Sequence, residues 1–153
     1  MNLSLRFDDS NYWQHDDITL RLGERTWIVD SYALALDNFI LPRREDAAKV
    51  RVVLQRLLEQ WLAALDTLPD GDTVYLPYDF ADQHTGWLRC RRSGAMIEVC
   101  AGRSHIEGWS FCPSEIGIHL RNLPGFRTDG EPVHALAEDV IKAVRASIDA
   151  TSQ

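Results

Sequence analysis

The sequence predicts an α+β fold in which a mostly antiparallel sheet packs against two amphipathic helices. Short segments of alternating apolar and polar residues come in pairs joined by turns, and two longer segments repeat apolar residues at intervals of three and four. The order along the chain is strands, helix, strands, helix. Because the strands are grouped in hairpins and only two helices are available as crossovers, an antiparallel sheet is favoured over parallel winding.

One domain is expected over residues 1–153. The chain contains no internal repeat, no low-complexity tract and no linker rich in Ser and Gly. With 153 residues, 45% of them hydrophobic, it is long enough to bury a core without disulfide bonds or a structural metal.

The first third of the chain has the pattern of strands. Residues 3–7 and 18–22 alternate in polarity, and residues 26–30 follow a Gly23-Glu24 turn as the hairpin partner of 18–22. Residues 32–37 are expected to continue that strand or to form another.

The first helix is predicted to begin at Pro42, where a missing N–H costs nothing, and to end at residues 69–72. Glu45 and Asp46 complement the positive end of its dipole. Its buried stripe consists of Val50, Leu54, Leu57, Leu58, Trp61 and Leu65.

A strand at residues 73–80 contains Pro77, so it is predicted to lie at a sheet edge or to bend there. Residues 87–92 and 95–100 flank Ser93-Gly94, which is expected to be a two-residue hairpin turn. In that register Arg89 lies opposite Glu98, and Trp87 shares their face and is expected to be exposed. The opposite, core-facing side consists of Leu88, Cys90, Ile97 and Val99.

The last third is predicted to hold one strand and one helix. Residues 108–113 have the pattern of a strand ended by Pro113, and residues 115–126 are mixed. A helix is expected to start at residues 129–132. Its buried stripe consists of Val133, Leu136, Val140, Ile141, Val144 and Ile148.

The charge balance argues against a nucleic-acid partner. Sixteen Lys and Arg residues against 23 Asp and Glu residues give a net charge of −7, which repels a phosphate backbone and suits a basic partner. No secretory signal and no run of about 18 apolar residues is present, so no membrane partner is expected. Three cysteines without CxxC spacing indicate reduced thiols and a cytoplasmic protein.

No cofactor and no metal is expected. The chain has no P-loop, no dinucleotide-binding GxGxxG, no HExxH and no GxSxG. The soft metal ligands are not arranged at the compact spacings of a zinc site, and Asp79, Asp82 and Glu107 are the carboxylates near them. These soft ligands are His84, His105, His119, Cys100 and Cys112.

Residues 78–87 contain the one catalytic alternative. Asp79, Asp82 and His84 could converge there with His105, Cys100 or Ser104 as a small hydrolase site within residues 79–105. The competing interpretation is a polar turn in which Asp82 caps the loop and Gly86 supplies an unusual backbone angle.

Residues 6–17, RFDDSNYWQHDD, combine carboxylates with large aromatic rings. Interface hot spots are rich in Trp and Tyr, and carboxylates around them steer a cationic partner. The alternative is a plain connecting loop whose tryptophan folds back into the core. The expected partner contacts are Asp8, Asp9, Tyr12, Trp13, Asp16 and Asp17, with Asp79, Asp82 and Trp87 as a second patch.

Small size, acidity, an α+β pattern, the absence of catalytic motifs and aromatic rings within acidic loops together make a profile that resembles the immunity proteins of bacterial toxin–immunity systems. The resemblance extends over the whole chain and rests on no diagnostic motif. It implies a monomeric or dimeric, non-enzymatic protein that neutralises a cognate basic protein toxin. The alternatives are the hydrolase above and a structural or assembly subunit that self-associates through an edge strand.

Overall fold

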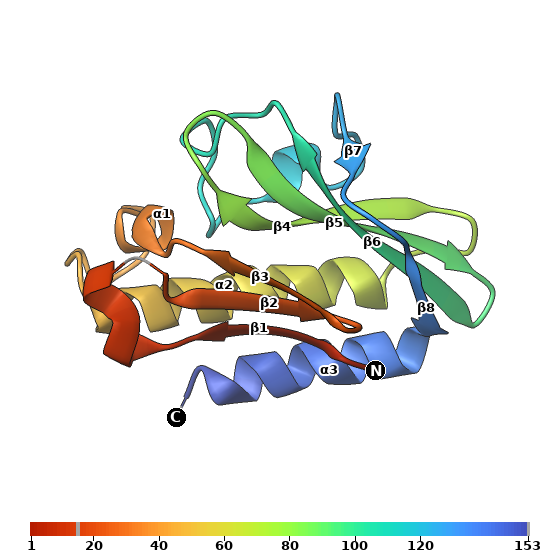
Figure 1. Ribbon diagram of the computed structural model, residues 1–153, viewed down its shortest axis with the longest axis horizontal. Coiled ribbons are helices and arrows are strands. Elements are labelled where there is room, and N and C mark those ends of the chain that lie inside the picture. Colours follow the sequence, from red (N-terminus) through yellow and green to blue (C-terminus); the bar gives the residue numbers. More distant parts are fainter. Residues whose placement is uncertain (15, 153) are drawn as a thin grey trace.

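The computed structural model describes residues 1–14 and 16–152, and the side chains of Asn11, Trp13 and Gln14 lie outside that description. Two antiparallel sheets and two long helices give an α+β fold, which confirms the predicted fold class. Figure 1 shows the first sheet between the C-terminal helix on one side and the second sheet on the other. One hydrophobic cluster contains buried residues from both sheets and from both long helices.

The first sheet has the order β1 (Leu3–Phe7), β2 (Ile18–Leu22) and β3 (Arg25–Val29). Ile18 pairs with Val29, so the predicted hairpin after Gly23 is confirmed. The short 3-10 helix η1 (Asp9–Gln14) connects β1 to β2. The outer edge of β1 is covered by a helix, α3 (Ala137–Ala150), since the Leu5 N–H donates to Ser147 Oγ at 3.1 Å.

The predicted strand at residues 32–37 is wrong, because a short helix, α1 (Tyr32–Ala35), begins there. Asp17 accepts the Ser31 N–H at 3.0 Å, and Asp30 accepts the Tyr32 N–H at 2.8 Å. These side chains take backbone donors that a sheet ladder would otherwise use, so the chain turns after β3.

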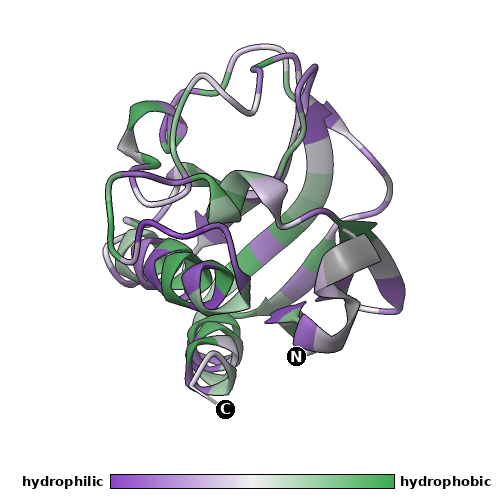
Figure 2. Ribbon diagram, turned by 90° about the vertical axis from the view of Figure 1, so that its left-hand side faces the viewer, coloured by the Kyte–Doolittle hydropathy of each residue, from purple (hydrophilic) through white to green (hydrophobic). Residues whose placement is uncertain are grey.

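The long helix α2 (Ala47–Asp66) begins later than the sequence predicts. Asp46 is its N-cap and accepts the Lys49 N–H at 2.9 Å, whereas Pro42 lies in the preceding loop. The predicted stripe is buried along its whole length, and Trp61 Nε1 donates to the carbonyl of Pro77 at 3.0 Å. Figure 2 looks along α2 and α3, on which hydrophobic and hydrophilic residues alternate around the axis.

The second sheet has the order β4 (Thr73–Phe80), β5 (Thr85–Ser93), β6 (Met96–Ser104) and β7 (Arg127–Thr128), and β8 (Val133–Leu136) also pairs with β6. The strand with Pro77 lies at the edge and its register shifts between Pro77 and Asp79. The predicted edge position of this strand is therefore confirmed.

The β5–β6 hairpin turns one residue later than predicted. Ser93 pairs with Met96, so the turn residues are Gly94, with a φ of 61°, and Ala95. Arg89 consequently pairs with Cys100, yet its guanidinium still reaches Glu98 at 3.6 Å along the diagonal. With the turn one residue later, each residue of β5 pairs with the residue of β6 two positions beyond the predicted partner. Side chains alternate with a period of two, so the predicted apolar face is unchanged, and all four of its residues are buried.

Two predictions for the last third are wrong. Residues 108–113 form turns rather than a strand, with one isolated bridge between Cys112 and Glu115. The final helix begins at Ala137, because residues 133–136 pair with β6 as β8. The free edge of β6 offers backbone partners there, and the first helical N–H, that of Ala137, also donates to Ala95 at 2.7 Å. A second 3-10 helix, η2 (Gly117–His119), lies between these segments.

Within residues 1–14 and 16–152, no helix is both long enough and apolar enough to cross a membrane.

Candidate functional site

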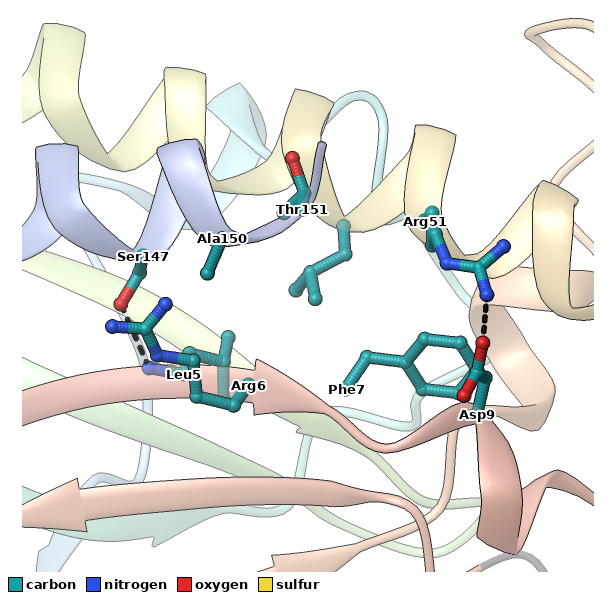
Figure 3. A pocket seen from close by; sticks show the side chains of 9 residues that line it. Leu5, Arg6, Phe7, Asp9, Arg51, Ser147, Ala150 and Thr151 are labelled. Atoms are coloured by element: carbon teal, nitrogen blue, oxygen red, sulfur yellow. Dashed lines mark hydrogen bonds and ion pairs between the residues drawn. The ribbon is translucent and has the colours of Figure 1, made fainter. Parts of the chain in front are cut away.

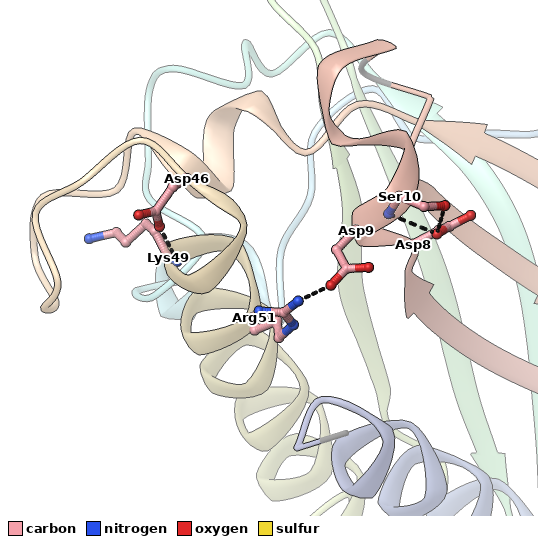
Figure 4. A network of polar contacts seen from close by, with 6 residues as sticks. All are labelled: Asp8, Asp9, Ser10, Asp46, Lys49 and Arg51. Atoms are coloured by element: carbon pink, nitrogen blue, oxygen red, sulfur yellow. Dashed lines mark hydrogen bonds and ion pairs between the residues drawn. The ribbon is translucent and has the colours of Figure 1, made fainter.

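Asp8 and Asp9, at the start of η1, both have partners within the fold. Asp8 Oδ1 accepts the Ser10 N–H at 3.1 Å and the Ser10 hydroxyl at 2.7 Å. Asp9 forms an ion pair with Arg51 of α2 (Figure 4). The same two residues line a small groove of about 300 Å³ between β1 and the helices, where Figure 3 shows their contact. The Asp9–Arg51 ion pair therefore ties η1 to α2, whereas the bonds of Asp8 are made within the turn that starts η1.

Asp17 lies inside the protein, with only 1% of its surface exposed. Its carboxylate accepts hydrogen bonds from the Ser31 N–H and, at 2.7 Å, from the Ser31 hydroxyl. Burial raises the pKa of Asp17, although the bonds from Ser31 act in the opposite direction. The expected contact role of Asp17 does not fit this position, and its role is to tie the β1–β2 connection to α1.

The remaining expected contacts of this stretch differ from one another. Tyr12 is half-buried, and its hydroxyl donates to the carbonyl of Glu45 at 2.9 Å. Asp16 is exposed. The side chain of Trp13 lies outside the part of the chain that the structure describes, so its expected contact role stays a prediction.

A cleft of about 430 Å³ opens between α1 on one side and the end of β4 with residues 108–113 on the other. We call it the acidic–aromatic cleft. Trp109 is 73% exposed and Tyr32 is 52% exposed, so two rings on its wall face solvent. The residues that give the cleft its chemistry are Asp30, Tyr32, Asp79, Asp82, Trp109 and Phe111.

Asp79 and Asp82, both expected contacts, are thus brought together in one cleft. Asp82 is exposed, whereas Asp79 is partly covered. Burial raises the pKa of Asp79, and the carboxylate of Asp30 adds to the rise, while His84 and Arg103 oppose it. The ionised form of Asp79 is therefore less favourable here than that of an exposed carboxylate, because Asp79 is less hydrated and lies near the negative charge of Asp30.

Asp30 links the two patches that the sequence suggested separately. Its charge raises the pKa of Asp17 in one patch and of Asp79 in the other. The sequence did not indicate Asp30, because its proximity to Asp79 depends on how the two sheets meet. The exposed rings of Tyr32 and Trp109 were also not indicated by the sequence as a pair.

The expected exposure of Trp87 is wrong. Trp87 lies on the predicted face of β5, but it is 0% exposed. Phe111 stacks on its ring at a centroid distance of 5.5 Å, and His119 meets its ring edge-on at 6.1 Å. Residues 108–119 cover this end of the sheet, so Trp87 supports the wall of the cleft from beneath and does not reach a partner.

The residues of the hydrolase alternative do not converge in one place. Asp79 and His84 line a neighbouring cleft of about 510 Å³ together with Arg103. Asp82 lines the acidic–aromatic cleft instead, and His105 shares a third cleft with His84. In the described part of the chain, no group of three or more His, Cys, Asp or Glu residues is placed to hold a metal ion.

No protein-family model, curated protein sequence or solved structure matches this chain.

Proposed function

We propose that the protein binds a basic protein partner through the acidic–aromatic cleft and does not transform it chemically. The observation that carries the proposal is the combination of two solvent-facing rings, Trp109 and Tyr32, with the carboxylates of Asp30, Asp79 and Asp82 in one cleft. Aromatic rings bring a large contact area at small entropic cost, and carboxylates beside them select cationic side chains.

The overall charge supports the same partner. A net charge of −7 draws a basic protein toward the molecule before contact, and the cleft then supplies short-range attraction. Asp16 adds an exposed negative charge next to buried Asp17. Neutralisation of a basic protein toxin, as in the immunity proteins that the chain resembles, is the form of this function that we propose.

Affinity capture from the native organism tests the proposal with matched variants. The double variant Trp109→Ala/Asp82→Asn removes one ring and one charge from the cleft, whereas Glu59→Gln removes a charge from the exposed side of α2. The wild type and Glu59→Gln should capture the same basic protein, and the double variant should lose it. Capture should weaken as salt is raised, because charges separated by more than about 10 Å are screened at 0.1 M salt. Equal capture by all three proteins, or a partner that is acidic, would contradict the proposal.

A further inference from the structure

A second cleft has the opposite chemical character. It has a volume of about 480 Å³ and lies where the ends of β5 and β6 meet β7. We call it the basic cleft. The side chains that define it are His84, Arg103, His105, Arg127, Thr128 and Asp129.

The pairing of β6 with β7 places two arginines face to face. Arg103 and Arg127 are direct Cα partners across the two strands, so their side chains leave the sheet on the same face. Like charges in directly opposite positions destabilise a strand pair. One carboxylate, that of Asp129, forms an ion pair with Arg103 at 3.3 Å. Arg127 is exposed and has no ion-pair partner within residues 1–14 and 16–152.

The pairing of β5 with β6 brings two histidines to the same place. The last pair of that ladder is Thr85 with Ser104, so His84 and His105 follow directly at the strand ends and both line the cleft. His84 is two residues from Gly86 and His105 is two residues from Arg103, and residues two apart along a strand share a face, so both histidines lie on the face that carries the arginines. Four nitrogen-bearing side chains from three segments therefore surround one space.

The basic cleft is rich in cationic side chains, although the protein as a whole is acidic. Two arginines and two histidines meet a single aspartate here, in a chain whose net charge is −7. A bound anion would remove the repulsion between Arg103 and Arg127 that the pairing of the strands imposes. The geometry thus points to a negatively charged ligand.

We propose that the basic cleft binds the phosphate group of a small molecule. Arginine forks bind phosphate oxygens through paired hydrogen bonds, and a tetrahedral dianion accepts donors from several directions at once. The volume exceeds that of a phosphate ion and lies in the range of small-molecule sites. Since no Trp, Tyr or Phe of the described chain lines this cleft, the rest of the ligand is polar, as in a sugar phosphate, and not a stacked base.

The experiment follows the side-chain NMR signals of the histidines during titration with inorganic phosphate, ribose 5-phosphate, ribose or acetate. Saturable shifts of His84 and His105 are expected with the two phosphates, and tighter binding of ribose 5-phosphate would show that the cleft also recognises the rest of the ligand. Arg127→Gln should weaken phosphate binding about tenfold, the usual loss of one charged hydrogen bond. Arg91→Gln, which removes an exposed charge of β5 outside the cleft, should leave it unchanged.

Three results would overturn the proposal: no saturable shift with either phosphate, acetate binding as tight as that of phosphate, or equal affinity in the Arg127 and Arg91 variants. His105→Gln supplies a second variant at an exposed position, and it should also weaken phosphate binding. The basic cleft shares no lining residue with the acidic–aromatic cleft, so this test is independent of the search for a protein partner.

Discussion

Asp17 and Ser31 form a buried clasp in which the carboxylate accepts both the backbone N–H of Ser31, at 3.0 Å, and its hydroxyl, at 2.7 Å. The clasp fixes the start of α1 and with it Asp30 and Tyr32, which line the acidic–aromatic cleft. Asp17, which the sequence suggested as a partner contact, therefore affects the acidic–aromatic cleft by holding α1 in place.

The clasp predicts different effects for two neighbouring aspartates. Asp17→Ala leaves two buried donors without a partner, so it should lower the free energy of unfolding by about 1–3 kcal/mol. Asp16→Ala changes an exposed side chain and should stay within about 0.5 kcal/mol of the wild type. Urea unfolding of the three proteins measures both, and equal stabilities would show that the clasp contributes nothing.

Asp79 predicts a stability that depends on pH. Its pKa in the folded protein is raised, so its contribution favours folding while the carboxyl is protonated and is lost as the pH rises through the folded-state pKa. At neutral pH Asp79→Asn should therefore be more stable than the wild type, by less than about 1 kcal/mol. The difference should shrink in acid, where the wild-type carboxyl is protonated. Urea unfolding at neutral and acid pH checks the sign, and a variant that is less stable at neutral pH would contradict it.

Trp109, which lines the acidic–aromatic cleft, and Trp87, which is buried beneath its wall, are predicted to separate stability from binding. Trp87→Ala empties a fully buried site and should lower the free energy of unfolding by about 3–5 kcal/mol. Trp109→Ala should leave it within about 0.5 kcal/mol, yet weaken partner binding at least about tenfold. Thermal unfolding and titration calorimetry with the captured partner measure the two effects, and unchanged affinity in Trp109→Ala would remove this ring from the site.

Association kinetics should distinguish Asp16 from Asp9. The charge of Asp9 is paired with Arg51, whereas Asp16 is exposed and takes part in none of the ion pairs among the described residues. Asp16→Asn should thus slow association at low salt more than Asp9→Asn does, because an already neutralised charge contributes less to steering. Stopped-flow mixing with the partner measures both rates. The two variants should converge at high salt, and a larger effect of Asp9→Asn would argue against steering by Asp16.

Local patterns were sufficient to predict much of the fold. The stripe from Val50 to Leu65 identified α2, and alternation identified the two faces of the β5–β6 hairpin. The turn was predicted one residue too early, which shifts the pairing of the two strands by two residues. Because side chains alternate with a period of two, the assignment of residues to the two faces stayed correct. Pro77 located the sheet edge because it cannot donate a backbone hydrogen bond.

Predictions failed where a distant segment decides the outcome. Residues 133–136 continue the helical pattern in the sequence, but in the structure they form a strand that pairs with the edge of β6. Trp87 sits on the polar face of its hairpin and is buried only because Phe111 and His119 cover it. Likewise, Asp30 and Asp79 come close only when the two sheets are assembled, and no local pattern in either segment encodes their proximity.

Asp79 lines two clefts. One is the acidic–aromatic cleft, and the other contains His84 and Arg103, which also line the basic cleft. A phosphate held by Arg103 would deepen the negative potential at Asp79 and so strengthen the attraction for a cation on its other side. Thermodynamic reciprocity then requires that the cation strengthen phosphate binding by the same factor. A metabolite and a protein partner that occupy the two clefts would in this way reinforce each other across a single carboxylate.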